Sequence, residues 1–272
     1  MSSPRVLAAA AVAALALIAL AAAAADEGER YPIWWSSRLQ LESLDKIDER
    51  LNAPLWPPED GVEVFKDRLE GDGSVPKKAI VNNCLSLFRL IEEGYEPRYY
   101  IEFKRLMYVR ALCRAVIAFR RARPAKASHI RDFVFDADAV NHLPAMVVLG
   151  GGCDWRCRQY EANERHIPVA RFREITKLRV VTEIAIFLET EVSKNTLEIV
   201  GRADFNGDGL EDLIVFSTWS AIGGTAEYAD YFILGRESPD AIFHVLDADD
   251  HLCKDYQCTP PYSQPSVLRE GD

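Results

Sequence analysis

The sequence predicts an α+β fold in which a mostly helical N-terminal part precedes a C-terminal antiparallel β-meander. Between residues 41 and 124, apolar side chains recur at helical spacing in three stretches. From about residue 179 onward, β-branched and aromatic runs alternate with short turns, which indicates strands. The chain therefore divides into an apolar leader at 1–25, a mostly helical region at 26–170 and a β region at 171–272.

The first 25 residues are typical of a secretory signal peptide. They contain one early cation, Arg5, then an Ala-, Leu- and Val-rich run, and small residues at Ala23 and Ala25. An uncleaved membrane anchor is the alternative, because the run from Val6 is about 20 residues long, near the length that spans a bilayer. Its Ala-rich composition and small-residue end favour cleavage near Ala25. We therefore expect a periplasmic or secreted protein with no membrane span after cleavage.

Composition limits the partners of the mature chain. Cleavage leaves about 247 residues, enough for a substantial core, with a formal charge one unit more negative than the −10 of the whole chain. Nucleic acid is disfavoured as a partner, because phosphate binding depends on a positive surface. An unidentified protein or an envelope glycan is the expected partner.

The six cysteines are expected to form disulfides, because oxidising compartments keep thiols paired. Two pairs follow from close spacing, one in a Gly-rich turn and one near the C-terminus, and the remaining two cysteines form the third pair. Zinc bound by the closely spaced cysteines with His166 or His251 is the alternative, and disulfides are favoured over it in an exported chain. The expected pairs are Cys84 with Cys113, Cys153 with Cys157, and Cys253 with Cys258.

Three helices are expected in the helical region, at about 41–53, 76–94 and 99–123. A short loop joins the second helix to the third, so the two should lie antiparallel as a helical hairpin. Cys84 and Cys113 would then differ in height by roughly 3 Å, which a disulfide tolerates. The third helix is rich in arginine, a pattern that could bind anionic glycans or lipid head groups but more often faces acidic groups of its own chain.

The remaining elements follow from turn signals. Residues 128–152 contain a possible N-cap, Ser128, and two breaks at Pro144 and the glycines that follow, which predict short helices and a turn. The β region should form four or five antiparallel strands, because its connections are short. The expected strands are 179–190, 196–203, 212–220, 226–236 and 241–248.

One stretch of the β region carries specific chemistry. Residues 204–212 read DFNGDGLED and place side-chain oxygens of Asp204, Asn206, Asp208 and Asp212 at relative positions 1, 3, 5 and 9, with the Leu210 carbonyl at position 7. Such hard donors suit Ca²⁺, which takes six to eight oxygen ligands. A self-capping acidic turn is the alternative, but a turn needs only one or two such residues. The spacing therefore favours calcium, in a structural rather than a catalytic role.

The loop is not an EF-hand, because position 12 is Val215 and the flanking residues indicate strands. It resembles instead the calcium loops of FG-GAP and VCBS-type repeats, in which this pattern links two antiparallel strands of exported proteins, and the match runs from Ala203 to Phe216. The resemblance implies the same five calcium ligands: Asp204, Asn206, Asp208, Leu210 through its carbonyl, and Asp212.

The chain departs from those repeats in two respects. It has one copy of the pattern, and residues 217–228 lack the Gly-Ala-Pro segment of the family, so a propeller and an adhesive role are not implied. The loop and residues 223–236 also resemble exported proteins of Gram-negative bacteria with a single such unit, a likeness that implies no function.

No catalytic motif is present: the sequence lacks G-x-S-x-G, a Walker loop and H-E-x-x-H. We therefore expect a non-enzymatic, exported calcium-binding protein with a binding or envelope role. The alternative is a calcium-stabilised envelope hydrolase that acts through acidic residues. It would require a cleft, away from the loop, in which two carboxylates converge. Trp34, Trp35 and Trp56 could stack on sugars, but packing over the helical part is favoured.

Overall fold

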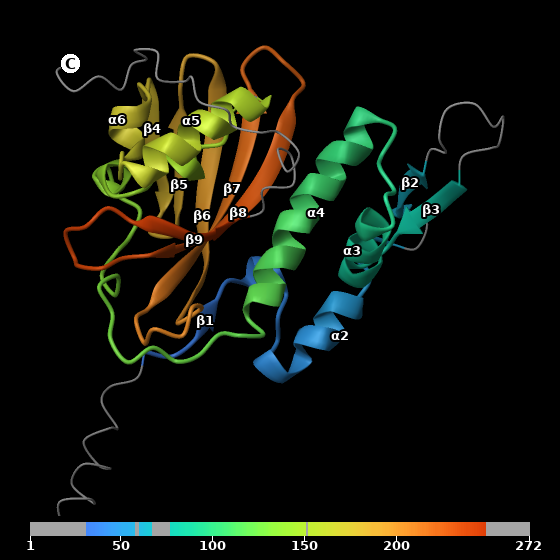
Figure 1. Ribbon diagram of the computed structural model, residues 1–272, viewed down its shortest axis with the longest axis horizontal. Coiled ribbons are helices and arrows are strands. Elements are labelled where there is room, and N and C mark those ends of the chain that lie inside the picture. Colours follow the sequence, from blue (N-terminus) through green and yellow to red (C-terminus); the bar gives the residue numbers. More distant parts are fainter. Residues whose placement is uncertain (1–30, 58–59, 67–76, 151, 249–272) are drawn as a thin grey trace, which may run out of the picture.

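A single antiparallel sheet organises the C-terminal part of the chain, as the sequence predicts. The structure is a computed structural model that describes residues 31–57, 60–66, 77–150 and 152–248. Strands β4 to β9 follow one another in the sheet in chain order, each antiparallel to its neighbour (Figure 1). Their bounds are β4 Lys177–Thr182, β5 Ala185–Glu189, β6 Ser193–Ala203, β7 Asp212–Ala221, β8 Glu227–Gly235 and β9 His244–Ala248.

A short strand from the N-terminal part completes this sheet. Strand β1 (Trp34–Trp35) pairs antiparallel with β6, with Trp34 opposite Arg202 and Trp35 opposite Gly201. β6 can accept it because β5 pairs only with the first half of β6. The sheet thus has seven strands.

Helices and a small hairpin make up most of the remaining structure. The hairpin consists of β2 (Val62–Lys66) and β3 (Lys77–Val81), which pair antiparallel. The α-helices are α2 Ile47–Asn52, α3 Cys84–Glu92, α4 Tyr100–Ala118, α5 Gly152–Glu164 and α6 Val169–Phe172. The 3₁₀ turns are η1 Ser37–Leu39, η2 Leu44–Lys46, η4 Ala139–Asn141 and η5 Ala145–Val147. None of the helices in the described ranges is long and apolar enough to cross a membrane.

The two faces of the sheet are covered by different parts of the chain. Figure 1 shows α4 lying along one face, with α2, α3 and the β2–β3 hairpin outside it, and α5 and α6 on the other face. Successive side chains of a strand point to opposite faces of the sheet, so each strand contributes residues to the hydrophobic cores on both faces. On β7, Ile214 and Phe216 pack toward α4, whereas Leu213 and Val215 pack against residues 130–149.

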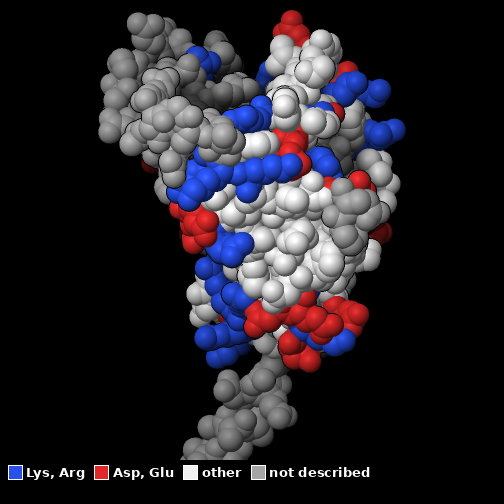
Figure 2. Space-filling model, turned by 90° about the vertical axis from the view of Figure 1, so that its right-hand side faces the viewer, with Lys and Arg blue, Asp and Glu red and all other residues white. Residues whose placement is uncertain are grey.

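The outer side of the helical layer is largely uncharged at its centre. Figure 2 shows this side, with Lys and Arg mainly above and beside a continuous uncharged area and Asp and Glu below it. β3 and α3 each expose a large apolar side chain, Ile80 at 52% and Leu85 at 41%.

A disulfide joins α3 to α4. Cys84 and Cys113 are both 1% exposed, their Cα atoms lie 5.6 Å apart, and they are bonded to each other. The other closely spaced pair differs from expectation in its backbone, because Cys153 and Cys157 lie in helix α5 rather than in a Gly-rich turn. Cys157 is disulfide-bonded. The side chain of Cys153 is not described, and Cys253, Cys258 and the predicted signal segment lie outside the described residues.

Two other expectations are wrong. The predicted helix at 76–94 begins only at Cys84, and residues 77–81 form β3. Asn83 starts the helix, because its side chain accepts a hydrogen bond from the Ser86 amide at 2.7 Å and Ser86 Oγ accepts one from the Asn83 amide at 3.1 Å. The predicted strand at 179–190 is a hairpin, β4 and β5, with a tight turn at 183–184.

We predict that replacing Cys84 and Cys113 together by alanine lowers the free energy of unfolding by about 3 kcal/mol, because the cross-link closes a loop of 29 residues in the unfolded chain. Urea denaturation under non-reducing conditions, with the native chain as reference, measures the difference. An unchanged midpoint and slope would contradict the stabilising role.

Candidate functional site

The five predicted calcium ligands lie on the loop that connects β6 to β7. Ala203 and Asp212 are opposite each other in the ladder, so the loop spans the residues between the two central strands of the sheet. Asp204 and Asp212 at its base are 4% and 1% exposed, whereas Asn206 and Asp208 are exposed. The loop thus has a buried base and a solvent-facing tip.

Asp204 points into the loop. Its Oδ1 accepts a hydrogen bond from the Gly207 amide at 2.6 Å, and its Oδ2 accepts one from the Gly209 amide at 3.0 Å. Both glycines have positive φ, +87° and +89°, a conformation that glycine adopts without the steric cost of a side chain. The two glycines therefore let the chain fold back so that its amides face the carboxylate.

Asp212 closes the base from the other strand. Its Oδ2 accepts a hydrogen bond from the Phe205 amide at 2.9 Å. Burial of the carboxyl, together with the negative charges of Asp208 and Asp204, raises the pKa of Asp212 to about 7, although the Phe205 amide opposes this shift. The three carboxylates therefore lie near enough to repel one another.

The tip residues bond within the loop. Asp208 accepts hydrogen bonds from the Leu210 amide at 2.7 Å and from Asn206 Nδ2 at 2.8 Å, and Asn206 Oδ1 accepts one from the Asp208 amide at 2.9 Å. A carboxylate has about four lone-pair positions, so these bonds leave acceptor capacity on each aspartate.

Within the described ranges, no three His, Cys, Asp or Glu side chains form a group arranged to hold a metal ion. Asp204, Asp208 and Asp212 therefore do not form such a group by themselves, and the predicted donor set adds an amide oxygen and a main-chain carbonyl to them. Hard oxygen donors of this kind suit Ca²⁺ and not zinc, which prefers nitrogen and sulfur. The donor chemistry therefore fits calcium, and the assignment remains a proposal.

A segment far away in the sequence holds the loop. Arg123 and Asp204 exchange both backbone hydrogen bonds, at 3.0 and 2.9 Å, and the Gly209 carbonyl accepts from the Lys126 and Ala127 amides at 2.8 and 3.1 Å. Ser128 Oγ also donates to Glu211 at 2.6 Å. No residue pattern indicates that residues 123–128 hold the loop, because these contacts use mainly backbone atoms.

An aromatic contact anchors the same loop to the end of α4. Phe205 is 2% exposed, and its ring meets that of Phe119 edge-on, with centroids 5.2 Å apart. Phe119 in turn meets Trp35 of β1 at 5.9 Å. The loop is thus joined to both α4 and the N-terminal strand.

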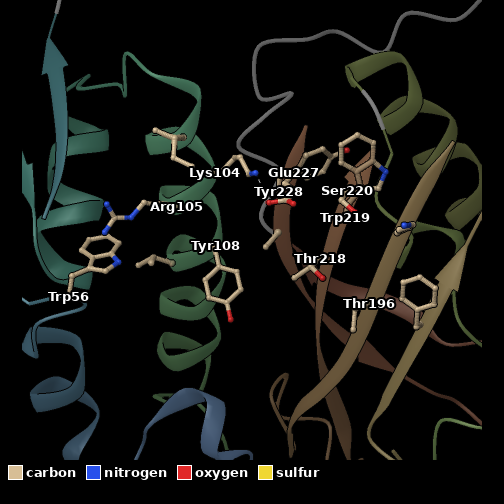
Figure 3. A pocket seen from close by; sticks show the side chains of 15 residues that line it. Trp56, Lys104, Arg105, Tyr108, Thr196, Thr218, Trp219, Ser220, Glu227 and Tyr228 are labelled. Carbon is tan, nitrogen blue, oxygen red and sulfur yellow. Dashed lines mark ion pairs between the residues drawn. The ribbon is translucent and has the colours of Figure 1, made fainter. Parts of the chain in front are cut away.

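A cavity of about 550 Å³ lies between the N-terminal half of α4 and the sheet. Figure 3 shows Tyr108 projecting from α4 toward the sheet and Thr196 and Thr218 projecting from the strands opposite it. We call this space the α4 groove. It is lined by Trp56, by Ile101, Lys104, Arg105, Tyr108 and Val109 of α4, and by Phe187, Lys194, Thr196, Thr218, Trp219, Ser220, Glu227, Tyr228 and Ala229 of the sheet.

The α4 groove is remote from the loop that connects β6 to β7. It borders the start of β6 and the end of β7, whereas the loop joins the end of β6 to the start of β7. At 3.3 Å per residue, Thr196 lies roughly 25 Å from Asp204 along the strand. An ion in the loop would therefore not reach a ligand in the groove.

The arginines of the predicted basic helix mostly have partners in the chain. Arg121 pairs with Asp247 at 2.8 Å, Arg120 pairs with Asp48, and Arg110 is buried. Arg105 faces the α4 groove. Of the three tryptophans, Trp35 packs in the core and donates to the Leu41 carbonyl at 2.6 Å, whereas Trp56 lines the groove.

Comparisons with protein-family models, curated proteins and solved structures found no match to this chain.

We predict that Asp212 makes the stability of the metal-free protein fall as the pH rises from about 4 to about 7. An aspartate in an unfolded chain ionises near pH 4, and the folded protein retains this proton up to the raised pKa of about 7. Between these values the folded state binds more protons than the unfolded state, so each increase in pH favours unfolding.

Melting temperatures measured in EGTA from pH 4 to pH 8 test this. Asp212→Asn, which keeps an acceptor for the Phe205 amide, should match the native protein at pH 4 and melt at a higher temperature at pH 7. Asp132→Asn, an exposed aspartate outside the loop, serves as the control. A constant difference across the pH range would rule out the titration of Asp212.

Proposed function

We propose that this chain is an exported, non-catalytic calcium-binding protein in which one Ca²⁺ stabilises the turn between β6 and β7. The ion would be held by Asp204, Asn206, Asp208, the Leu210 carbonyl and Asp212. The observation that carries the proposal is the near-complete burial of Asp204 and Asp212, at 4% and 1% exposure. Buried carboxylates are costly unless a cation or hydrogen bonds compensate them.

No cation among the described residues pairs with the carboxylates of the loop. In the part of the chain that the structure describes, no Lys, Arg or His forms an ion pair with Asp204, Asp208 or Asp212. Two carboxylates 4 Å apart near a protein surface repel each other by about 4 kcal/mol. A divalent ion would remove this repulsion and use the acceptor capacity that the loop's own amides leave.

The role of the ion would be structural. The loop is bonded to residues 123–128, which follow α4, so an ion that fixes the loop also fixes the attachment of that helix. At an affinity of about 10⁻⁴ M, typical of extracellular modules, 1 mM Ca²⁺ would stabilise the fold by about 1.4 kcal/mol.

Export is supported by two independent features. Residues 1–25 have the pattern of a signal peptide, and Cys84 and Cys113 form a disulfide, which oxidising compartments maintain. We therefore place the protein in the periplasm or outside the cell, where calcium is available at millimolar concentration.

Binding is favoured over hydrolysis. Among the described residues that line the α4 groove, Glu227 is the single carboxylate, and it pairs with Lys104 at 2.6 Å. Several aspartates line a hollow near residues 128–142. Two of them already accept hydrogen bonds from neighbouring residues. Asp136 accepts two backbone amides, and hydrogen bonds from Asn141 and His142 lower the pKa of Asp138, the opposite of what a general acid requires.

We predict that 1 mM Ca²⁺ raises the melting temperature by about 3–5 °C relative to EGTA at pH 7, as expected for a gain of about 1.4 kcal/mol in a domain of this size. Differential scanning calorimetry measures the shift. Asp204→Asn and Asp208→Ala should abolish it, Asp132→Asn should keep it, and a zinc-selective chelator should have no effect. Superimposable curves in calcium and EGTA for the native chain would refute the proposal.

A further inference from the structure

The α4 groove has the properties of a ligand site that the calcium proposal does not use. A volume of about 550 Å³ falls within the range of small-ligand pockets. Its walls come from segments far apart in the sequence, namely Trp56, helix α4 and strands β5 to β8. Two of its α4 side chains remain open to solvent, since Ile101 is 61% and Tyr108 37% exposed. The groove is therefore accessible from outside.

Contacts at both ends keep the groove open at a fixed width. At one end, Lys104 of α4 pairs with Glu227 of β8 at 2.6 Å, and the Tyr100 hydroxyl bonds to the Glu227 backbone. At the other end, Arg38 bonds to the Tyr108 hydroxyl and to Glu198 of β6. Between these contacts, side chains of α4 and of the sheet face each other across the groove, as Figure 3 shows for Tyr108 and Thr218.

The floor of the groove is a flat row of side chains across four strands. Phe187 of β5 lies opposite Thr196 of β6, Thr196 opposite Thr218 of β7, and Thr218 opposite Ala229 of β8. Side chains opposite each other in a ladder lie about 5 Å apart. The floor therefore presents an aromatic ring, two neighbouring hydroxyl groups and a small residue to one ligand.

The groove is positively charged within an acidic protein. Its described lining has three cations, Lys104, Arg105 and Lys194, and one anion, Glu227, whereas the whole chain has a formal charge of −10. Arg179 of β4 adds a further cation at the rim, 5.4 Å from the centroid of the Phe187 ring. This local reversal of charge favours an anionic ligand.

We propose that the α4 groove binds an acidic oligosaccharide, that is, a chain of sugar rings that carry carboxylates. Sugar rings present flat C–H faces to the aromatic rings and hydroxyl groups to the threonines, and their carboxylates suit the exposed Lys194. Arg105 contributes positive charge at the side of the groove, where it stacks on Trp56 and donates to the Asp60 carbonyl at 2.8 Å. This assignment does not depend on calcium, because the groove and the loop are at opposite ends of the β6–β7 hairpin.

An acidic peptide fits the groove less well. A common way for a peptide to bind to a sheet is to add a strand to a free edge. The floor strands β6 and β7 are paired on both sides along the groove, so they offer no free backbone groups there. The floor instead offers side-chain hydroxyls, which are both donors and acceptors as sugar hydroxyls require.

Isothermal titration calorimetry of the full-length mature chain tests the proposal. The probes are a hexamer of galacturonic acid, a neutral hexamer of glucose and hexaglutamate, each at 20 and 200 mM salt. We expect the acidic hexamer to bind at least roughly tenfold more tightly than either of the others, and more weakly at high salt. EGTA should change its affinity by less than roughly twofold, because the loop is remote.

Variants locate the binding. Lys194→Gln should weaken the acidic hexamer by roughly fivefold, the upper range for an exposed ion pair. Phe187→Leu, which keeps an apolar side chain but removes the ring, should weaken it by up to roughly tenfold. Lys46→Gln on η2, remote from the groove, is the matched control and should bind like the native chain.

Melting temperatures show whether each variant is folded. Thr218→Val is a further variant that should fold, because it keeps the shape of the side chain. Equal affinity for the acidic and neutral hexamers, tighter binding of hexaglutamate, or no difference between Lys194→Gln and Lys46→Gln would each overturn the proposal. A loss of binding in EGTA would overturn its independence from calcium.

Discussion

The burial of two carboxylates within one hairpin turn is the constraint on which the organisation of this molecule depends. Asp204 and Asp212 can be buried there because the loop turns its own amides inward and because residues 123–128 bond to its outer side. That bonding fixes the chain as it leaves α4. Contacts from Tyr100 and Lys104 to β8 fix the other end of the helix. The α4 groove keeps its shape because the helix beside it is attached at both ends.

The sequence predicted those parts of the fold that depend on local patterns. The periodicity of residues 99–123 indicated α4, and alternating β-branched runs indicated β6, β7, β8 and β9. It failed where a tertiary contact overrides a local pattern. Residues 77–81 follow a proline and precede a helix, but they extend because they pair with β2, the preceding strand of the chain. Trp34 and Trp35 form a strand because β6 has an unpaired stretch, which no local pattern indicates.

The two candidate sites also differ in how far the sequence can predict them, because sequence patterns are local and cannot indicate tertiary contacts. The five proposed calcium ligands lie within nine consecutive residues, so their spacing alone suggested the ion. The groove combines Trp56, one face of α4 and a row across four strands, and these segments meet only after folding. Thr196 and Thr218 do not stand out in the sequence, because β6 and β7 both contain other polar residues. Their positions in the sequence also do not show that the two threonines lie side by side.

The pairing of β1 with β6 determines when the sheet can be completed. Trp34 lies opposite Arg202, so about 170 residues separate the two partners along the chain. Contacts between such distant segments slow folding, because a long loop must close before they form. If the chain crosses a membrane from its N-terminus, the first mature residues emerge long before their partner strand. Those early tryptophans would then remain unpaired during translocation, and assembly of the sheet would wait until most of the polypeptide had arrived.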